Sequence, residues 1–370
     1  GDVYKRQANP MLDAYADRKW ATLQDTPLEF TITRENYEDE MTGTIVENKE
    51  LSALLEKHGI SPIPKDFLGG RVGIVNKKGT HALLAIKEYL PTLAKNMPFA
   101  DEYEQNISTD TDAKQTMVDV DLVAVTGDVG EYRGGITLAE NLPNDDKLSL
   151  TIGGGRRNVY HRQIRFISDM KKLQERLDEI LDKEQHQFYL DEADHWFTIG
   201  HENAHSLGPK KACETLGKYR NIIEENKADM GALAFVDLLT ELGMYTEEQR
   251  KQIIVTTIAD NFLKSKPTMS QAHRVRTVMQ NKYFAERGAY DIIDGKIHVN
   301  IDKVVPIAKE MLAEIIRIQI EGDFDKAEKY VLDNFVWTDN MELIAQKLQK
   351  INKTLNGRTE SELAEKLLKE

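Results

Sequence analysis

The stretch HENAHSLGPK, from His201 to Lys210, carries the strongest signal in the sequence. His201 and His205 are four residues apart, so on an α-helix their imidazoles share one face and can hold one metal ion. Glu202 follows His201 and is turned slightly aside, which suits a general base that takes a proton from a water at the metal. The stretch therefore predicts a zinc-binding helix that carries its own catalytic base. The alternative is a polar helix end that carries two histidines by chance.

The residues around this stretch predict where the helix begins and ends. Gly208 and Pro209 follow the second histidine directly, and this pair is a common helix stop. The acidic residues Asp191 and Asp194 lie upstream and mark the two positions at which the helix is expected to begin. The histidines should therefore lie on the last turns of a helix.

A third metal ligand is expected in IIEENKADMGALAF, from Ile222 to Phe235, because two histidines alone cannot close a catalytic zinc site. Glu225 lies 20 residues after His205, and the turn at Gly208 lets this second helix fold back onto the first. Asp229 can then hold the far nitrogen of a ligand histidine, and Glu224 is a second candidate for this supporting role. A solvated acidic helix face is the other interpretation of these carboxylates.

The two motifs together resemble those of a known family. HENAHSLGP and EENKAD are similar to the zinc motifs of the dipeptidyl peptidase III family of zinc exopeptidases. They resemble most the plant and bacterial branch, in which a Gly-Pro turn follows HExxH and the second motif reads EEAKAD. Animal and yeast members carry one more residue in the first motif. The resemblance implies one zinc ion per chain, bound by His201, His205 and Glu225.

Two further segments resemble substrate-binding parts of the same family. ENLPND is similar to a segment whose asparagines bind the free amino end and backbone of the substrate, which implies this role for Asn141 and Asn144. QAHRVRTVMQ is similar to a segment whose histidine stabilises the transition state, which implies this role for His273. Turn chemistry around Pro143 and a surface position in a helix's first turn are the alternatives. Glu29 is a poor match to the family's amine-binding glutamate.

The resemblance runs from about residue 28 to about residue 335. The resemblance implies an additional N-terminal region that we expect this chain to lack. The first residues, GDVYKRQANP, contain no initiator methionine and no apolar signal core. We therefore expect the natural front end to be missing. This leaves export open and puts substrate anchoring in doubt.

Composition excludes several classes of function. The net charge of −13 argues against a broad phosphate-binding surface and hence against a nucleic-acid partner. Apolar runs stay far below the roughly 18 residues that a membrane helix needs. Cys213 is the only cysteine, so no internal disulfide can form, which fits a reducing compartment. We expect a cytoplasmic protein.

The chain changes character near residue 160. Short β-rich runs come before it, at Leu28–Thr33, Arg71–Asn76, Val118–Gly127 and Lys147–Ile152, with amphipathic segments near Leu51–His58 and His81–Lys95. The later part is mainly helical and includes a run over 161–181, a capping box at Thr246–Gln249 and a hairpin around Asp294-Gly295. Four helices are expected near 301–320, 323–333, 338–350 and 359–369.

These patterns predict an α+β fold with two lobes and a cleft between them. Residues 1–160 form a mainly β-containing lobe with a helical insert at about 49–112 that can pack on the other lobe. Residues 161–335 form a helical zinc lobe, and residues 336–370 form C-terminal helices. The resemblance implies that the lobes interleave in sequence.

The sequence thus predicts a zinc metallopeptidase with Glu202 as general base. The resemblance implies that it releases dipeptides from the N-termini of short peptides. The alternatives are a zinc endopeptidase or another zinc hydrolase, and a peptide-binding protein that has lost turnover. The presence of Glu202 speaks against the last of these.

Overall fold

The computed structural model describes residues 28–36, 57, 66–105, 107, 117–126, 139–142, 157–162, 167–209, 213–264, 266–269 and 271–352. The chain divides into two compact units that interleave in sequence. The first comprises Gly1–Lys87 and Asp110–Ile164, and the second comprises Glu88–Thr109 and Arg165–Glu370. The first contains a five-stranded sheet and the second is mainly helical, so the fold is α+β, as the sequence predicts.

The sheet of the first unit is mixed and has the strand order β1-β2-β3-β5-β4. β1, β2 and β3 are antiparallel neighbours, β5 runs parallel to β3, and β4 pairs antiparallel with β5 at one edge. The predicted strands near residues 28, 71 and 118 correspond to β1, β2 and β3; the strand expected at 147–152 lies outside the described residues. The strand bounds are Leu28–Asn36 (β1), Asp66–Val75 (β2), Met117–Thr126 (β3), Ala139–Leu142 (β4) and Arg157–Arg162 (β5).

The prediction of one helix over residues 161–181 is wrong at its beginning. His161 and Arg162 end strand β5, and helix α6 begins only at Ile167. The apolar spacing of this region fits a helix, but the segment RNVYHR instead forms backbone pairs with β3, about forty residues earlier in the chain. Such non-local pairing outweighs a local propensity, which is weak for strands in particular.

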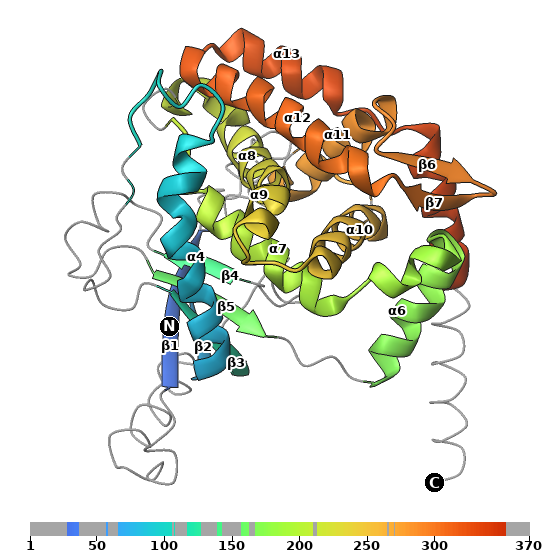
Figure 1. Cartoon of the computed structure of the whole chain (residues 1–370), viewed down its shortest axis with the longest axis horizontal. Coiled ribbons are helices and arrows are strands. Elements are labelled where there is room, and N and C mark those ends of the chain that lie inside the picture. Colours follow the sequence, from blue (N-terminus) through green and yellow to red (C-terminus); the bar gives the residue numbers. More distant parts are fainter. Residues whose placement is uncertain are drawn as a thin grey trace, which may run out of the picture. The chain divides into compact units, whose positions relative to one another are not determined.

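The second unit is built from helices joined by short connections (Figure 1). α4 (Lys77–Lys95) leads into it from the first unit, and the helix expected at 81–95 lies within α4. A further helix occupies residues 339–352. The remaining elements are α6 (Ile167–Ile180), η3 (Lys183–Phe188), α7 (Asp191–Ala204), η4 (Cys213–Tyr219), α8 (Arg220–Ala234), α9 (Val236–Glu241), α10 (Glu247–Leu263), α11 (Ala272–Glu286), β6 (Tyr290–Ile293), β7 (Lys296–Val299), α12 (Ile301–Glu321) and α13 (Phe324–Asn334).

Several local predictions in this unit are confirmed. Thr246 and Gln249 form the reciprocal hydrogen bonds of a capping box at the start of α10. Asp294 and Gly295 both have positive φ, of 50° and 72°, as a type I′ turn between β6 and β7 requires. Short-range side-chain chemistry thus determines these boundaries. The segments expected to be helical near residues 51–58 and 359–369 lie outside the described residues, except for Lys57.

Helix α8 lies at the centre of the core and packs against α7, α11 and α12 (Figure 1). Ile223, Met230 and Leu233 on α8 are completely buried in the main hydrophobic cluster. α7 and α8 approach each other closely because Gly231 faces Ala204, where an added Cβ would lie only 2.8 Å from the Ala204 Cβ. A larger residue here would force the helices apart, so the glycine fixes the spacing between two helices that carry candidate ligands.

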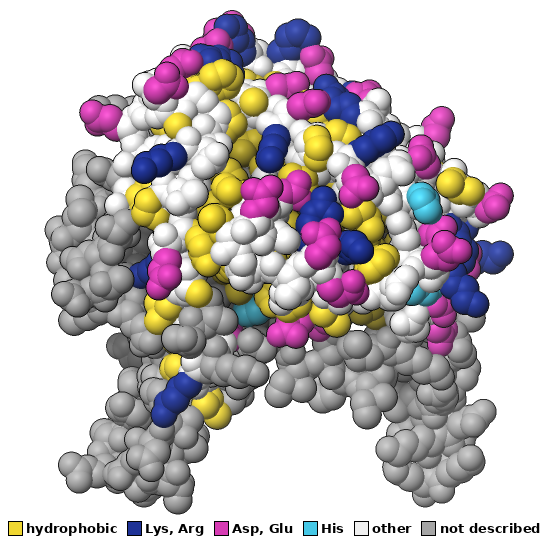
Figure 2. Space-filling view, viewed as in Figure 1, with side chains coloured by type: hydrophobic (Ala, Val, Ile, Leu, Met, Phe, Trp, Pro, Cys, Tyr) yellow, Lys and Arg dark blue, Asp and Glu magenta, His cyan; other side chains and the backbone are white. Residues whose placement is uncertain are grey.

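Basic and acidic side chains are intermixed on the face of the second unit shown in Figure 2. This face therefore offers no extended surface of one charge to a phosphate backbone. Among the described residues, no helix is both long and apolar enough to cross a membrane.

Candidate metal centre

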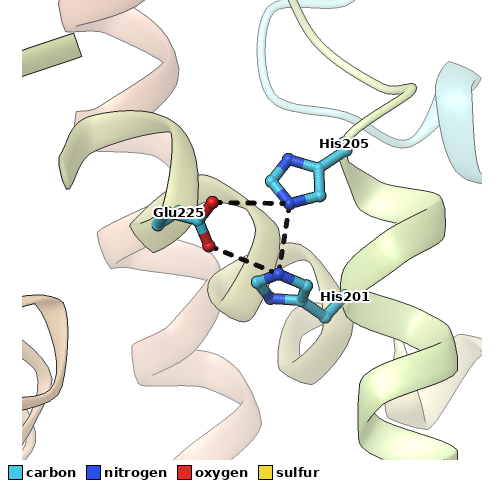
Figure 3. Close-up of side chains that lie close together, drawn as sticks. All are labelled: His201, His205 and Glu225. Carbon is cyan, nitrogen blue, oxygen red and sulfur yellow. Dashed lines mark hydrogen bonds and ion pairs between the residues drawn. The ribbon is translucent and has the colours of Figure 1, made fainter. Parts of the chain in front are cut away.

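Three side chains from α7 and α8 converge at one point (Figure 3). The Nε2 atoms of His201 and His205 lie 3.1 Å apart. Glu225 Oε2 is 3.4 Å from His201 Nε2, and Glu225 Oε1 is 3.9 Å from His205 Nε2. One candidate ligand atom from each residue lies within 4.8 Å of the other two, so the group could hold a metal ion.

Both ends of α7 are stabilised by residues in or next to them. Three acidic residues, Asp191, Glu192 and Asp194, occupy its first turn, where they complement the helix dipole. His205 is the C-terminal cap, and Gly208 follows with φ of +87°, a left-handed conformation that glycine adopts without strain. The Gly208 N–H donates to Gln105 Oε1 at 3.0 Å, which ties the turn to a loop of the same unit. The two imidazoles are thereby presented at a fixed helix end.

The first histidine belongs to a buried set of side chains that we call the His201 arm: His201, Asp229, Arg276 and Gln280. His201 Nδ1 lies 2.7 Å from Asp229 Oδ1. The other oxygen of Asp229 accepts a hydrogen bond from Gln280 Nε2 at 2.8 Å and lies 2.7 Å from Arg276 Nε. Asp229 and Gln280 are almost inaccessible to solvent, so the arm fixes the ring orientation of His201 in the core.

The second histidine has its own support, the His205 arm: His205, Glu224, Lys227 and Gln319. His205 Nδ1 lies 2.9 Å from Glu224 Oε1, and Glu224 Oε2 accepts from Gln319 Nε2 at 2.9 Å. Lys227 Nζ lies 2.8 Å from Glu224 Oε1 and donates to the carbonyl of Leu207 at 2.7 Å. Lys227 therefore joins the supporting carboxylate to the end of α7.

The hydrogen bonds of the two arms determine how the rings are protonated. An ionised carboxylate only accepts hydrogen bonds, so each Nδ1 must carry a proton and donate it to its carboxylate. In the neutral rings the lone pairs of both Nε2 atoms then face each other and the Glu225 carboxylate. Three electron-rich groups at this separation repel unless a cation lies among them. The donor set of two imidazoles and one carboxylate fits a divalent metal ion such as zinc.

The charges around this group shift the pKa values of three side chains. Burial opposes protonation of His201, but its hydrogen bonds to Asp229 and Glu225 outweigh this and raise its pKa to about 9. Burial favours the neutral acid at Glu224, yet the charge of Lys227 and the hydrogen bond from His205 lower its pKa to about 2. Burial likewise opposes ionisation of Asp229, but the Arg276 charge holds its pKa well below the usual range. In the metal-free protein, the proton on His201 thus supplies the positive charge between the two imidazoles and the Glu225 carboxylate.

The other predicted site residues are placed less completely. Glu202 lies on α7 directly after His201 and is partly buried. His273 lies in the first turn of α11, and Asn141 lies on the edge strand β4 of the first unit, but their side chains are outside the described residues. The same holds for the side chain of Glu29 on β1, and Asn144 lies entirely outside. The role of these residues stays a prediction.

Sequence reasoning missed the groups that hold the carboxylates. Lys227 is only 1% exposed, and its spacing of three residues from Glu224 on one helix is a signal that could have revealed the pair. Arg276 lies three residues after His273, but nothing in the sequence indicates that it contacts Glu225 and Asp229. Gln280 and Gln319 come from other helices and could not have been found by local spacing.

Comparison with solved structures shows which fold this is. The chain superposes on a structure of dipeptidyl-peptidase III (DPP III) from Caldithrix abyssi with a TM-score of 0.68 and 23% identity, covering 95% of this chain and 66% of that one. It superposes on dipeptidyl-peptidase III from Corallococcus sp. strain EGB with a TM-score of 0.68 and 19% identity, covering 94% of this chain and 62% of that one. The chain therefore has the fold of these structures and spans about two thirds of their length.

A relative with another name matches in sequence. The chain is 26% identical over 368 residues to Nudix hydrolase 3 from Arabidopsis thaliana, which covers 95% of this chain but 43% of that protein. More than half of that protein lies outside the match, so its name does not assign a reaction to this chain. No family model matches the chain.

Proposed function

We propose that this chain is a zinc peptidase that releases dipeptides from the N-termini of short peptides. The single observation that carries the proposal is the group of His201, His205 and Glu225, in which each imidazole is oriented by a carboxylate on its far nitrogen. Histidines oriented in this way are typical of metal ligands. The likeness of the fold to dipeptidyl-peptidase III structures supports the same proposal.

Each residue would have a distinct role in catalysis. His201, His205 and Glu225 would hold zinc, which when bound acts as a Lewis acid on the peptide carbonyl and makes water a better nucleophile. Glu202 would take the proton of the attacking water at its carboxylate and pass it to the leaving amine. His273 would donate a hydrogen bond to the carbonyl oxygen as negative charge develops on it.

The specificity for a free N-terminus would come from Asn141 and Asn144. The amino end of a peptide is a cation that needs oxygen acceptors when it leaves water, and asparagine amides offer both acceptors and donors. The net charge of −13 also favours a cationic peptide end. The substrate is thus expected to be a short peptide with an unblocked amine.

The test is cleavage of one dipeptidyl arylamide with a free or acetylated N-terminus, with and without a chelator. We expect chelator-sensitive release of the arylamine from the free form and little from the acetylated form. The variant Glu202→Gln should keep its zinc and lose turnover by at least about 100-fold, because general-base catalysis typically contributes that much. Equal cleavage of both substrate forms would favour the endopeptidase alternative. Zinc binding without any cleavage would favour a peptide-binding protein.

A further inference from the structure

Arg276 contacts two carboxylates at the candidate metal centre, those of Glu225 and Asp229. It lies on α11, and its side chain is only 11% exposed. Its Nη1 donates to Glu225 Oε2 at 2.5 Å, and its Nε lies 2.7 Å from Asp229 Oδ2. One guanidinium therefore joins a candidate metal ligand to the carboxylate that orients His201.

We propose that Arg276 is a positioning residue. It restrains Glu225 so that one coordination position of the metal stays available to water or substrate, and it lowers the affinity for the metal in doing so. The proposal rests on the proposed function, because it requires an ion between His201, His205 and Glu225. The hydrogen bond from Arg276 occupies Glu225 Oε2, so this oxygen is less available to a metal ion. A catalytic zinc site uses three protein ligands and keeps one position for water or substrate. A glutamate with both oxygens available would tend to fill that position.

The charge of Arg276 would act directly on an ion bound at this point. The carboxylates of Glu224, Glu225 and Asp229 and the cations Arg276 and Lys227 lie around the two histidines. Lys227 lies against Glu224 and the end of α7, whereas Arg276 touches the candidate ligand itself. A positive charge this close to a divalent ion, in a partly buried place, repels it. Arg276 should therefore weaken zinc binding while it supports turnover.

Two variants separate the charge from the forked geometry. Arg276→Met removes both, so zinc should bind more tightly, by about tenfold, because a positive charge next to the ion is lost. The turnover number kcat should fall by about tenfold, within the usual range for residues around the ligands. Arg276→Lys keeps the charge but cannot bond both carboxylates, so zinc affinity should stay near that of the wild type while kcat falls. Arg287→Met is the matched control, because Arg287 caps the same helix and pairs with Glu310 outside the site.

Zinc affinity is measured by competition with a chromophoric chelator, and kcat with a dipeptidyl arylamide, in the full chain. Tighter zinc with slower turnover in Arg276→Met, and unchanged values in Arg287→Met, would support the proposal. Weaker or unchanged zinc binding in Arg276→Met would overturn it and make Arg276 a structural residue. If Arg276→Met does not fold, Arg276→Lys decides, and an unchanged kcat there overturns the proposal. A wild-type chain that binds no zinc would instead refute the proposed function.

Discussion

Asp229, in the His201 arm, has a side chain that is 5% exposed, whereas Glu224, in the His205 arm, is 28% exposed. Both carboxylates accept a hydrogen bond from the Nδ1 of a histidine and from the amide of a glutamine. The cations differ, because Asp229 meets Arg276 from α11 and Glu224 meets Lys227 from its own helix. The same chemical unit thus occurs twice, and the two copies differ in how exposed the carboxylate is.

The glutamines show what this difference means for the two arms. Gln280 uses its amide nitrogen for Asp229 and Asn226 and its oxygen for Asn261, so it cannot turn over without losing these bonds. Gln319 donates to Glu224, and among the described residues its Oε1 has no hydrogen-bond partner. Gln280 is therefore held at both ends of its amide, whereas Gln319 can turn its amide over without losing a bond at Oε1.

The largest effect is expected from Asp229→Asn. Asparagine can still accept from His201, but its NH₂ group then faces the amide donor of Gln280 and the guanidinium of Arg276. We expect zinc affinity to fall by about 100-fold, at the upper end of the range for residues that orient ligands. Competition with a chelator measures this, and circular dichroism checks that the variant is folded. A loss below about threefold would mean that Asp229 does not orient a ligand.

A smaller effect is expected from Glu224→Gln. The new NH₂ group faces Gln319, which can turn its amide over and present the oxygen that has no partner. We expect zinc affinity to fall by about tenfold or less, at the lower end of the same range. The same competition assay applies. If Glu224→Gln weakens zinc binding more than Asp229→Asn does, burial is not what distinguishes the two arms.

The smallest effect is expected on the stability of the metal-free protein, which should depend on pH. Because the pKa of His201 is raised to about 9, above the roughly 6.5 of an unfolded histidine, its proton stabilises the folded state fully below pH 6.5. This contribution is lost as the pH rises through about 9. The melting temperature of chelator-treated protein should therefore fall between pH 6.5 and 9.5. A parallel fall in Asp229→Asn, which removes the charge that holds the proton, would contradict the assignment.

The part of this site that follows from sequence is local. A four-residue spacing places His201 and His205 on one face, and the same spacing places Glu225 and Asp229 one turn apart. Gly208 marks the turn that follows the helix, although the helix itself ends earlier, with His205 as its cap. The sequence also contains Asp294-Gly295 and the capping box at Thr246, both of which form as expected. These features depend on neighbours within a few residues, so propensity and spacing decide them.

The rest depends on contacts between distant segments. β5 forms because Arg157–Arg162 pairs with β3, and only its last two residues, His161 and Arg162, fall within the helix that the spacing predicts. Arg276 and Gln319 reach the site from α11 and α12, which pack on α8 through buried apolar residues. No local pattern marks which polar residue of a helix will face a carboxylate on another helix. The close approach of α7 and α8 at Gly231 also depends on a residue far away in sequence, Ala204, so the sequence alone does not indicate it.

The central claim is that His201, His205 and Glu225 hold one ion. The direct measurement is elemental analysis of zinc per chain after loading and removal of excess metal, for the wild type, Glu225→Ala and Glu310→Ala. Glu310 is an exposed carboxylate on α12 and serves as the control. We predict one zinc per chain in the wild type and the control, and less than about a tenth of that in Glu225→Ala. A wild type without zinc, or a Glu225→Ala variant that keeps its zinc, would contradict this account.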